Sequence, residues 1–385
     1  MRKLIYDKRI KLLPLSQLSL KEITKNIFNI SSHSSYFKIL QLRYLKYILI
    51  SIFLILSCSE IGIEPKEAVV DEWTFLGLEN ETVTAIAIDP VDPNIIYAGT
   101  LYDFSAGING KLFKSINGGT TWDTLLVVGG YRKIIIDPLN PNIIYAASGG
   151  IMKSEDQGKT WQTIVNGIYI DYEKRVQSLA MNPKNPKVLY AGTGGFYGGT
   201  MYKSYDGGMH WNEIGNDSLN DGVVSIAIDP IDTNVIYAGT AWRGILWKST
   251  DAGNTWFHTG LGELGVHDIF IDPQTPTILY VGVPWLGIFK TENSGIYWEN
   301  ISQNLPTNCS VIKILKSSSS RLFLIASSRN VSGIYEYDIY NKWNKTGIDT
   351  LENQNYYYSD LKISSNPDKL YFGGKGGVYV MDLKE

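Results

Sequence analysis

An eight-residue motif recurs along this chain and constrains its fold more than any other feature. The pattern Ser-x-Asp-x-Gly-x-Thr-Trp is complete at 154–161 and at 249–256. More divergent copies lie at 115–122, 204–211 and 291–298. Successive copies are 39, 50, 45 and 42 residues apart. Periods of this length are typical of repeat architectures, in which each repeat is one supersecondary unit.

The residue types of this octet suit a tight turn between two strands. A short carboxylate or amide accepts a hydrogen bond from the backbone two residues on. Glycine supplies the positive φ of the turn, and tryptophan anchors the following strand in the core. We therefore expect the aspartates to be structural. Asp251→Ala should lower stability if the carboxyl is buried, and leave any ligand affinity nearly unchanged.

The sequence around the octets predicts four short strands in each repeat. The first strand, such as 85–88, is apolar and ends at Asp-Pro or Asn-Pro, because proline cannot donate to a sheet. The second is typified by Tyr-Ala-Gly-Thr at 97–100, the third precedes the octet, and the fourth starts at the tryptophan. Four short strands in about 45 residues are typical of one blade of a β-propeller.

The two ends of the repeat region are predicted to complete one blade together. The last repeat, 361–382, has three strands, and 73–78 supplies the fourth, with Trp73 at the position of the other tryptophans. Trp343 marks a degenerate repeat before it. The prediction is thus an all-β, seven-bladed β-propeller of four-stranded antiparallel blades over 71–385, closed by an N-terminal strand. Closure removes the exposed sheet edges.

These repeats resemble the Asp-box (BNR) propellers over about residues 71–385. That group holds sialidases, xyloglucanase-type glycoside hydrolases, sortilin-like receptor domains and photosystem II assembly factors. The octets and the Asp-Pro turns carry the resemblance. It is specific for the fold and weakly specific for function, because one fold supports many activities.

The N-terminal region, 1–58, has the features of a leader with a lipoprotein-type signal. An apolar run at 47–57 follows Arg43 and Lys46. It is shorter than the ~20 residues of a membrane-spanning helix, and a short apolar run behind basic residues is typical of a secretory signal. Ile-Leu-Ser-Cys at 55–58 resembles a bacterial lipobox, which implies a lipid anchor on Cys58. An ordinary signal peptide or a signal anchor is the alternative.

Residues 59–70 are expected to form a tether between the anchor and the propeller. The location this implies is the cell envelope, with the protein lipid-anchored to a membrane or secreted. A net charge of −3 without a basic stripe argues against a nucleic-acid partner. Cys58 and Cys309 are the only cysteines and the four histidines are scattered, so we expect no metal and no cofactor.

A binding site is expected on one particular face of the propeller. The Asp-Pro turns and the octet turns share one face, so the loops between second and third strands and between blades form the other. Loops on a rigid scaffold commonly carry binding residues. The candidate ligand-binding residues there are Tyr102, Asp103, Phe104, Phe196, Tyr197, Trp242, Arg243 and Trp285. Alternatively, Trp242 and Trp285 plug the central channel or pack between blades.

The case for an enzyme rests on carboxylates of the same face. A glycosidase needs two carboxyl groups at a defined separation. Asp103 is the first catalytic candidate, because 97–103 is similar to the Tyr-Ala-Arg-Thr-Asp sequence of xyloglucanase-type enzymes. Here the arginine is absent and the aspartate displaced by two positions. The other carboxylates placed on this face are Asp171, Glu173, Asp221, Glu263 and Asp268.

These departures, and the absence of a sialidase-type Arg-Ile-Pro motif, favour a non-catalytic role. We expect a binding or scaffold module for a polysaccharide or protein ligand. One alternative is a glycoside hydrolase, xyloglucanase-like or sialidase-like, acting on a β-glucan or another polysaccharide. Another is an assembly factor for a membrane protein complex.

Overall fold

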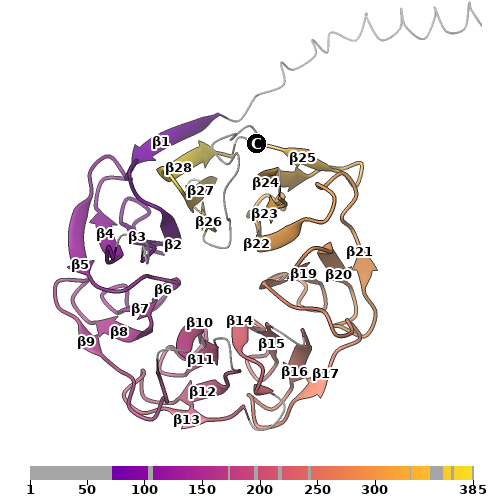
Figure 1. Cartoon of the computed structure of the whole chain (residues 1–385), viewed down its shortest axis with the longest axis horizontal. Coiled ribbons are helices and arrows are strands. Elements are labelled where there is room, and N and C mark those ends of the chain that lie inside the picture. The colour runs from indigo at the N-terminus through magenta and orange to yellow at the C-terminus, as the bar shows by residue number, and fades with distance from the viewer. Residues whose placement is uncertain are drawn as a thin grey trace, which may run out of the picture. The chain divides into compact units, whose positions relative to one another are not determined.

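The chain folds as a β-propeller, described here from a computed structural model. The residues described are 72–102, 107–171, 174–194, 198–215, 219–241, 244–329, 331–346, 359–365 and 368–383. They form five four-stranded antiparallel sheets and one eight-stranded sheet, arranged around a central opening (Figure 1). The predicted all-β fold is confirmed. Among these residues, no helix long and apolar enough to cross a membrane was found.

Consecutive strands of a blade pair with one another, as the repeat predicts. The first such blade comprises β2 (Val83–Ile88), β3 (Ile96–Thr100), β4 (Lys111–Ser115) and β5 (Asp123–Val127). The next comprises β6 (Lys133–Ile136), β7 (Ile144–Ser148), β8 (Gly150–Ser154) and β9 (Gln162–Thr163). Two more comprise β10 (Arg175–Met181), β11 (Leu189–Gly194), β12 (Met201–Ser204) and β13 (Asn212–Glu213), then β14 (Val223–Ile228), β15 (Ile236–Thr240), β16 (Leu246–Ser249) and β17 (Phe257–His258).

An eight-stranded sheet follows, in which a single parallel bridge between Gly287 and Ser310 joins two blade-like halves. The first half comprises β18 (Asp268–Ile271), β19 (Leu279–Val283), β20 (Gly287–Thr291) and β21 (Glu299–Asn300). The second comprises β22 (Ser310–Lys316), β23 (Leu322–Ser327), β24 (Ser332–Tyr337) and β25 (Trp343–Lys345). Counting the halves separately, the described strands form seven groups of four.

The N-terminal strand completes the last group, as predicted. β1 (Trp73–Gly77) pairs antiparallel with β28 (Gly377–Asp382), beside β27 (Asp368–Gly374) and β26 (Asp360–Ser365). The Trp73 indole N–H donates to the carbonyl of Thr346, 2.7 Å away, in the preceding blade. Pairing and packing therefore hold the two ends of the repeat region together, which is how a propeller closes its ring.

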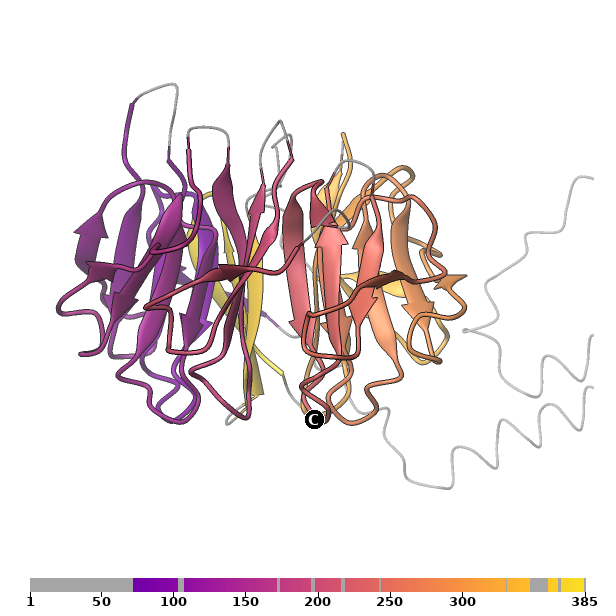
Figure 2. The same cartoon turned by 90° about the horizontal axis from the view of Figure 1, so that it is seen from below.

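The two kinds of turn share one face, and the strands run between the faces (Figure 2). The Asp229 carboxylate accepts the N–H groups of Ile231 and Asp232 at 2.8 and 3.0 Å, which closes the Asp-Pro turn. In the same blade the Ala252 N–H of the octet donates to the Asn234 carbonyl at 2.9 Å. The predicted assignment of turns to faces is therefore confirmed.

In the octet, the serine is the buried polar group. Ser249 is fully buried; its Oγ accepts the Gly253 N–H at 2.9 Å and donates to Asp251 Oδ1 at 2.8 Å. Asp251 is only partly buried and accepts both the N–H and the hydroxyl of Thr255. These hydrogen bonds lower the Asp251 pKa to about 2. A large stability cost for Asp251→Ala would require a buried carboxyl, and Asp251 is only partly buried. The buried polar side chain of this octet is Ser249.

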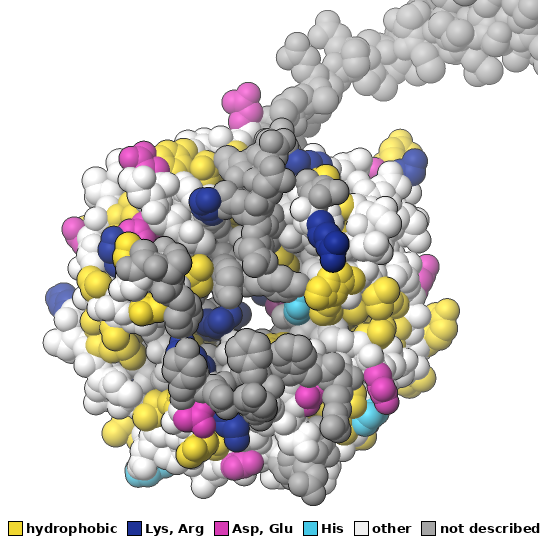
Figure 3. All heavy atoms as spheres, in the orientation of Figure 1, with side chains coloured by type: hydrophobic (Ala, Val, Ile, Leu, Met, Phe, Trp, Pro, Cys, Tyr) yellow, Lys and Arg dark blue, Asp and Glu magenta, His cyan; other side chains and the backbone are white. Residues whose placement is uncertain are grey.

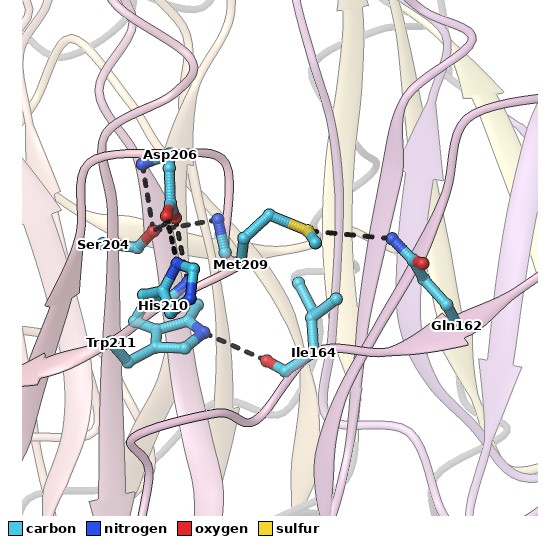
Figure 4. A network of polar contacts seen from close by, with 8 residues as sticks. Gln162, Ile164, Ser204, Asp206, Met209, His210 and Trp211 are labelled. Atoms are coloured by element: carbon cyan, nitrogen blue, oxygen red, sulfur yellow. Dashed lines mark hydrogen bonds and ion pairs between the residues drawn. The ribbon is translucent and has the colours of Figure 1, made fainter.

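The octet at 204–211 contains a histidine where the motif has threonine (Figure 4). His210 reproduces the threonine contacts: its N–H lies 2.9 Å from Asp206 Oδ1, and its Nδ1 lies 2.7 Å from Asp206 Oδ2. The indole N–H of Trp211 donates to the carbonyl of Ile164 at 3.0 Å, in the preceding blade. The octet therefore closes its own turn with hydrogen bonds and also contacts the preceding blade.

A tyrosine and a lysine of each typical blade clasp the next octet. The Tyr237 hydroxyl and the Lys248 ammonium both donate to the Ser294 carbonyl at 3.2 Å. Ser294 has a φ of 58°, the left-handed conformation that turns its carbonyl toward the neighbouring blade. Tyr190 and Lys203 contact the Ala252 carbonyl in the same way. These shared carbonyls explain why Tyr-Ala-Gly and Lys-Ser recur with the octet.

Candidate functional site

The central channel contains a cavity of ≈ 480 Å³. Its lining includes Leu101 and Tyr102, which follow β3, and Arg132 and His267, which precede β6 and β18. These positions belong to the loops between second and third strands and between blades. The cavity therefore lies toward the face predicted to bind a ligand. Figure 3 shows basic side chains and a histidine around the central opening of this face.

Two of the nine predicted site residues lie in the described part of the chain. Tyr102 lines the cavity, and Trp285 lies in the β19–β20 loop. Seven other predicted residues lie outside the described part of the chain: Cys58, Asp103, Phe104, Phe196, Tyr197, Trp242 and Arg243.

Trp285 is an exposed aromatic residue held in an uncommon backbone conformation. Its side chain is 56% exposed and its φ is 58°, which is rare for a bulky side chain. Its backbone N–H donates to the Ser310 hydroxyl at 3.1 Å, at the start of the next innermost strand. The neighbouring Leu286 is 46% exposed. Burial between blades, one alternative for Trp285, does not match this exposure.

Asp268 does not lie in a loop, contrary to the prediction. It is the first residue of β18, is buried, and lines the channel. Both carboxylate oxygens lie 3.0 Å from the Lys313 ammonium, and Oδ2 also accepts the Ile314 N–H at 2.8 Å. The strand begins earlier than the sequence indicates, because pairing of Asp268 with Gly282 extends the sheet by one position.

The innermost strands place one residue each at a common level of the channel. All seven pair with the corresponding position of the second strand, which is glycine in five blades. We call this set the channel ring: Ala85, Lys133, Ser178, Ser225, Asp268, Lys313 and Asp360.

The channel ring gathers charges that sequence analysis missed. Lys133 and Asp360 are the first residues of β6 and β26, and only Lys313 lies inside an apolar strand, where the charge was an available signal. Asp360 accepts the N–H groups of Ile86 and Leu361, each at 3.0 Å. Lys362, two residues further along β26, lies 3.7 Å from the same carboxylate.

These neighbours shift the pKa values of the ring. The ammonium groups of Lys362 and Lys313, together with burial, lower the pKa of Lys133 to about 7. Burial opposes the charged form of Lys313, but Asp268 and Asp360 outweigh it and raise the Lys313 pKa. Burial likewise opposes ionisation of Asp360, but Lys362, Lys313 and Lys133 lower its pKa.

Among the described carboxyl groups with a shifted pKa, none has the raised pKa of a general acid. Glycosidase chemistry needs one carboxyl whose pKa is raised so that it holds a proton. The carboxyl pKa shifts resolved in the described residues, those of Asp156, Asp206, Asp251, Asp272, Glu292, Asp338 and Asp360, are all downward. The described residues also contain no cluster of three His, Cys, Asp or Glu side chains able to hold a metal.

Comparison with solved structures places this fold among known propellers. An ancestral GH74 enzyme aligns with 64% of the chain at 21% identity and a TM-score of 0.53. YCF48 from Cyanidioschyzon merolae aligns with 80% at 14% identity and a TM-score of 0.60. The extracellular domain of BT4673, a one-component system of B. thetaiotaomicron, aligns with 82% at 14% identity and a TM-score of 0.61.

These similarities define the class of protein, which is a β-propeller, and the identities support the fold alone. The chain spans 35% of the GH74 enzyme and 40% of the BT4673 domain, but 98% of YCF48. No family model matches the sequence, and no curated protein matches it.

Proposed function

We propose that this protein is a non-catalytic binding module of the cell envelope whose ligand is a protein segment. The ligand binds across the loop face, where the channel cavity opens near Tyr102 and where Trp285 is exposed. The observation that carries the proposal is Trp285, a 56% exposed aromatic residue at a φ of 58°. Strained, exposed residues of this kind concentrate at ligand contacts, and aromatic residues are enriched in binding interfaces.

The surroundings of Trp285 support a preformed contact. The Ser310 hydroxyl accepts its N–H, and Ser310 also forms the parallel bridge with Gly287. The loop is thereby tied to two blades, so little ordering is needed when a ligand binds. A preorganised aromatic contact loses less conformational entropy on binding than a flexible one.

One of the comparisons supports a protein ligand. One similar structure is YCF48 bound to D1 peptide, which aligns with 83% of the chain at 13% identity and a TM-score of 0.58. Others are extracellular domains of sensor proteins. The enzymatic alternative receives less support, because the stretch 97–103 lacks the arginine of the Tyr-Ala-Arg-Thr-Asp sequence and has its aspartate displaced by two positions. Anchoring through Cys58 is part of the proposal and would hold the module at a membrane surface.

Selection of displayed random peptides against the full chain tests this proposal. Enriched peptides are then titrated against Trp285→Gly, which removes the ring and relieves the positive φ, and against Tyr297→Ala as a control. Tyr297 is an exposed aromatic residue of an octet turn, on the opposite face. We expect at least ~10-fold weaker binding for Trp285→Gly, the loss of one well-packed aromatic contact.

The control should bind like the parent protein. Equal losses in both variants, or peptides insensitive to Trp285→Gly, would refute the assignment of the face. If the chain binds glycans on an array and selects no peptide, the ligand class is polysaccharide instead.

A further inference from the structure

The charged residues of the channel ring and the neighbouring Lys362 together carry more positive than negative charge. Lys133, Lys313 and Lys362 oppose two carboxylates, Asp268 and Asp360. Both carboxylates are already engaged. Asp268 holds the Lys313 ammonium at 3.0 Å, and Asp360 has Lys362 at 3.7 Å as well as two backbone N–H donors.

Lys133 is the cation left over in this arrangement. Among the described residues, its ammonium has no ion pair and no side-chain hydrogen bond within contact distance, although it is largely removed from solvent and lines the cavity. Buried charges in proteins are ordinarily paired, because an uncompensated charge is costly away from water. The repulsion from Lys313 and Lys362 adds to that cost and is consistent with the lowered pKa of Lys133.

The cavity beside Lys133 can accept a small anionic group. Its ≈ 480 Å³ is bordered by the hydroxyls of Ser225 and Ser359, which can donate hydrogen bonds, whereas the Ser178 hydroxyl already donates to the Val223 carbonyl at 2.9 Å. Arg132 and Arg175 also line it, nearer the loop face. A single negative charge would balance the excess positive charge that Lys133, Lys313 and Lys362 carry over Asp268 and Asp360, and hydroxyl donors suit a carboxylate oxygen.

We propose that the channel ring binds a carboxylate, with Lys133 as its ionic partner. In the setting of the proposed function, on which the identity of the ligand rests, this group is the carboxylate of the bound protein segment. A free carboxylic acid offers the same chemistry. The bound carboxylate stabilises the ammonium form of Lys133, which the nearby positive charges of Lys313, Lys362, Arg132 and Arg175 disfavour. Lys133 therefore takes up a proton when the ligand binds near neutral pH. The other titratable side chains that line the cavity are Tyr102, Tyr131, His267, Asp268 and Asp360.

Calorimetric titration of the full chain tests the site without the protein ligand. Acetate, phosphate, and a short peptide with either a free or an amidated C-terminus are titrated at pH 8 in two buffers of different ionisation enthalpy. We expect acetate and the free-carboxylate peptide to bind with uptake of about one proton, and the amidated peptide to bind at least ~10-fold more weakly. Binding of acetate without the peptide would identify a free acid as the ligand.

Two substitutions separate charge from proton uptake. Lys133→Met should weaken acetate binding at least ~10-fold, and Lys133→Arg should retain binding but lose the proton uptake, because arginine stays charged. Lys187→Met, an exposed lysine in an Asn-Pro turn on the other face, is the matched control and should change neither. Wild-type acetate binding by Lys133→Met, or tighter binding of phosphate than of any carboxylate, would overturn the proposal.

The outcomes also distinguish this inference from the proposed function. If acetate binds through Lys133 but no peptide is selected by the loop face, the carboxylate site stands and the protein-ligand proposal fails. If selected peptides bind through Trp285 but acetate, free-carboxylate peptides and amidated peptides are indistinguishable, the carboxylate site fails alone.

Discussion

Replacement of Ser249 by alanine tests how the octets stabilise the blades. The substitution removes the acceptor of the Gly253 N–H, and this backbone group is buried. A buried donor left without a partner costs about 1–3 kcal/mol. The Asp251 N–H, at 3.3 Å from the same oxygen, loses a weaker contact. We therefore expect the free energy of unfolding to fall by about 2 kcal/mol.

The corresponding change in melting temperature follows from the size of the domain. Unfolding entropy is about 2.1 cal/mol/K per residue, so the roughly 310 residues between 72 and 383 give about 0.65 kcal/mol/K. A loss of ~2 kcal/mol then lowers the melting temperature by about 3 °C. Differential scanning calorimetry at pH 7 measures this shift directly.

The chain provides its own control for this substitution. Thr291 occupies the serine position in another octet, and its hydroxyl accepts the Gly295 N–H at 3.1 Å. Ser249→Thr should therefore retain most of the stability that Ser249→Ala loses. If Ser249→Ala and Ser249→Thr have the same melting temperature, or if Ser249→Ala melts at the temperature of the parent protein, the buried hydroxyl does not stabilise the turn.

Three further predictions concern packing and pH. Gly239→Ala should lower the free energy of unfolding, measured with denaturant, by about 2 kcal/mol or more, because its Cβ would lie 2.5 Å from Val266 Cγ1. Unchanged stability would show that neighbouring blades move apart at little energetic cost. Burial lowers the His267 pKa to about 4, against a smaller opposing effect of Asp268, so the unfolded chain binds a proton between pH 6.5 and 4 that the folded chain does not. The melting temperature should therefore fall as the pH is lowered from 6.5 to 4. In His267→Gln this decrease should be smaller in thermal scans. The pKa of Lys133 is about 7 in the folded chain and 10.5 in the unfolded chain. The free-energy cost of holding its charge in the folded protein is therefore complete below pH 7 and absent above pH 10.5. Lys133→Met should thus stabilise the protein at pH 6, on the order of 2 kcal/mol, and little at pH 10; an equal gain at both would exclude the charge as its cause.

Local sequence signals predicted the repeating framework well, because each signal acts within a few residues. Asp-Pro ends a strand wherever it occurs, since the Asp229 carboxylate caps its own turn and proline has no N–H. The octet likewise closes on itself through Ser249 and Gly253. Closure by β1 was predictable because Trp73 stands where the other tryptophans stand, and the structure pairs it with Met381.

Contacts between blades were not predictable, because they depend on register across strands far apart in the chain. The clasp of Tyr237 and Lys248 on the Ser294 carbonyl joins residues 57 and 46 positions apart. The channel ring depends on β-bulges, such as that between Val83 and Ala85, which change the strand's register with its partner. The lysine that directly precedes each octet, and the tyrosine of the recurring second strand, were the visible signs of the clasp.

The candidate site was predicted at the level of the face. Loops opposite the turns place Tyr102 at the cavity and leave Trp285 exposed. The charges of the ring were missed, because a lone lysine in an apolar strand is ambiguous until its neighbours are known. Asp268 illustrates this, since its partner Lys313 lies 45 residues away.

The proposed non-catalytic role depends most on the absence of glycosidase activity, and reducing-sugar release tests this directly. The full chain is incubated with a panel of soluble β-glucans that includes xyloglucan. We expect no release above that of a heat-denatured sample. Release that disappears in Asp103→Asn would contradict this expectation and identify the protein as a glycoside hydrolase.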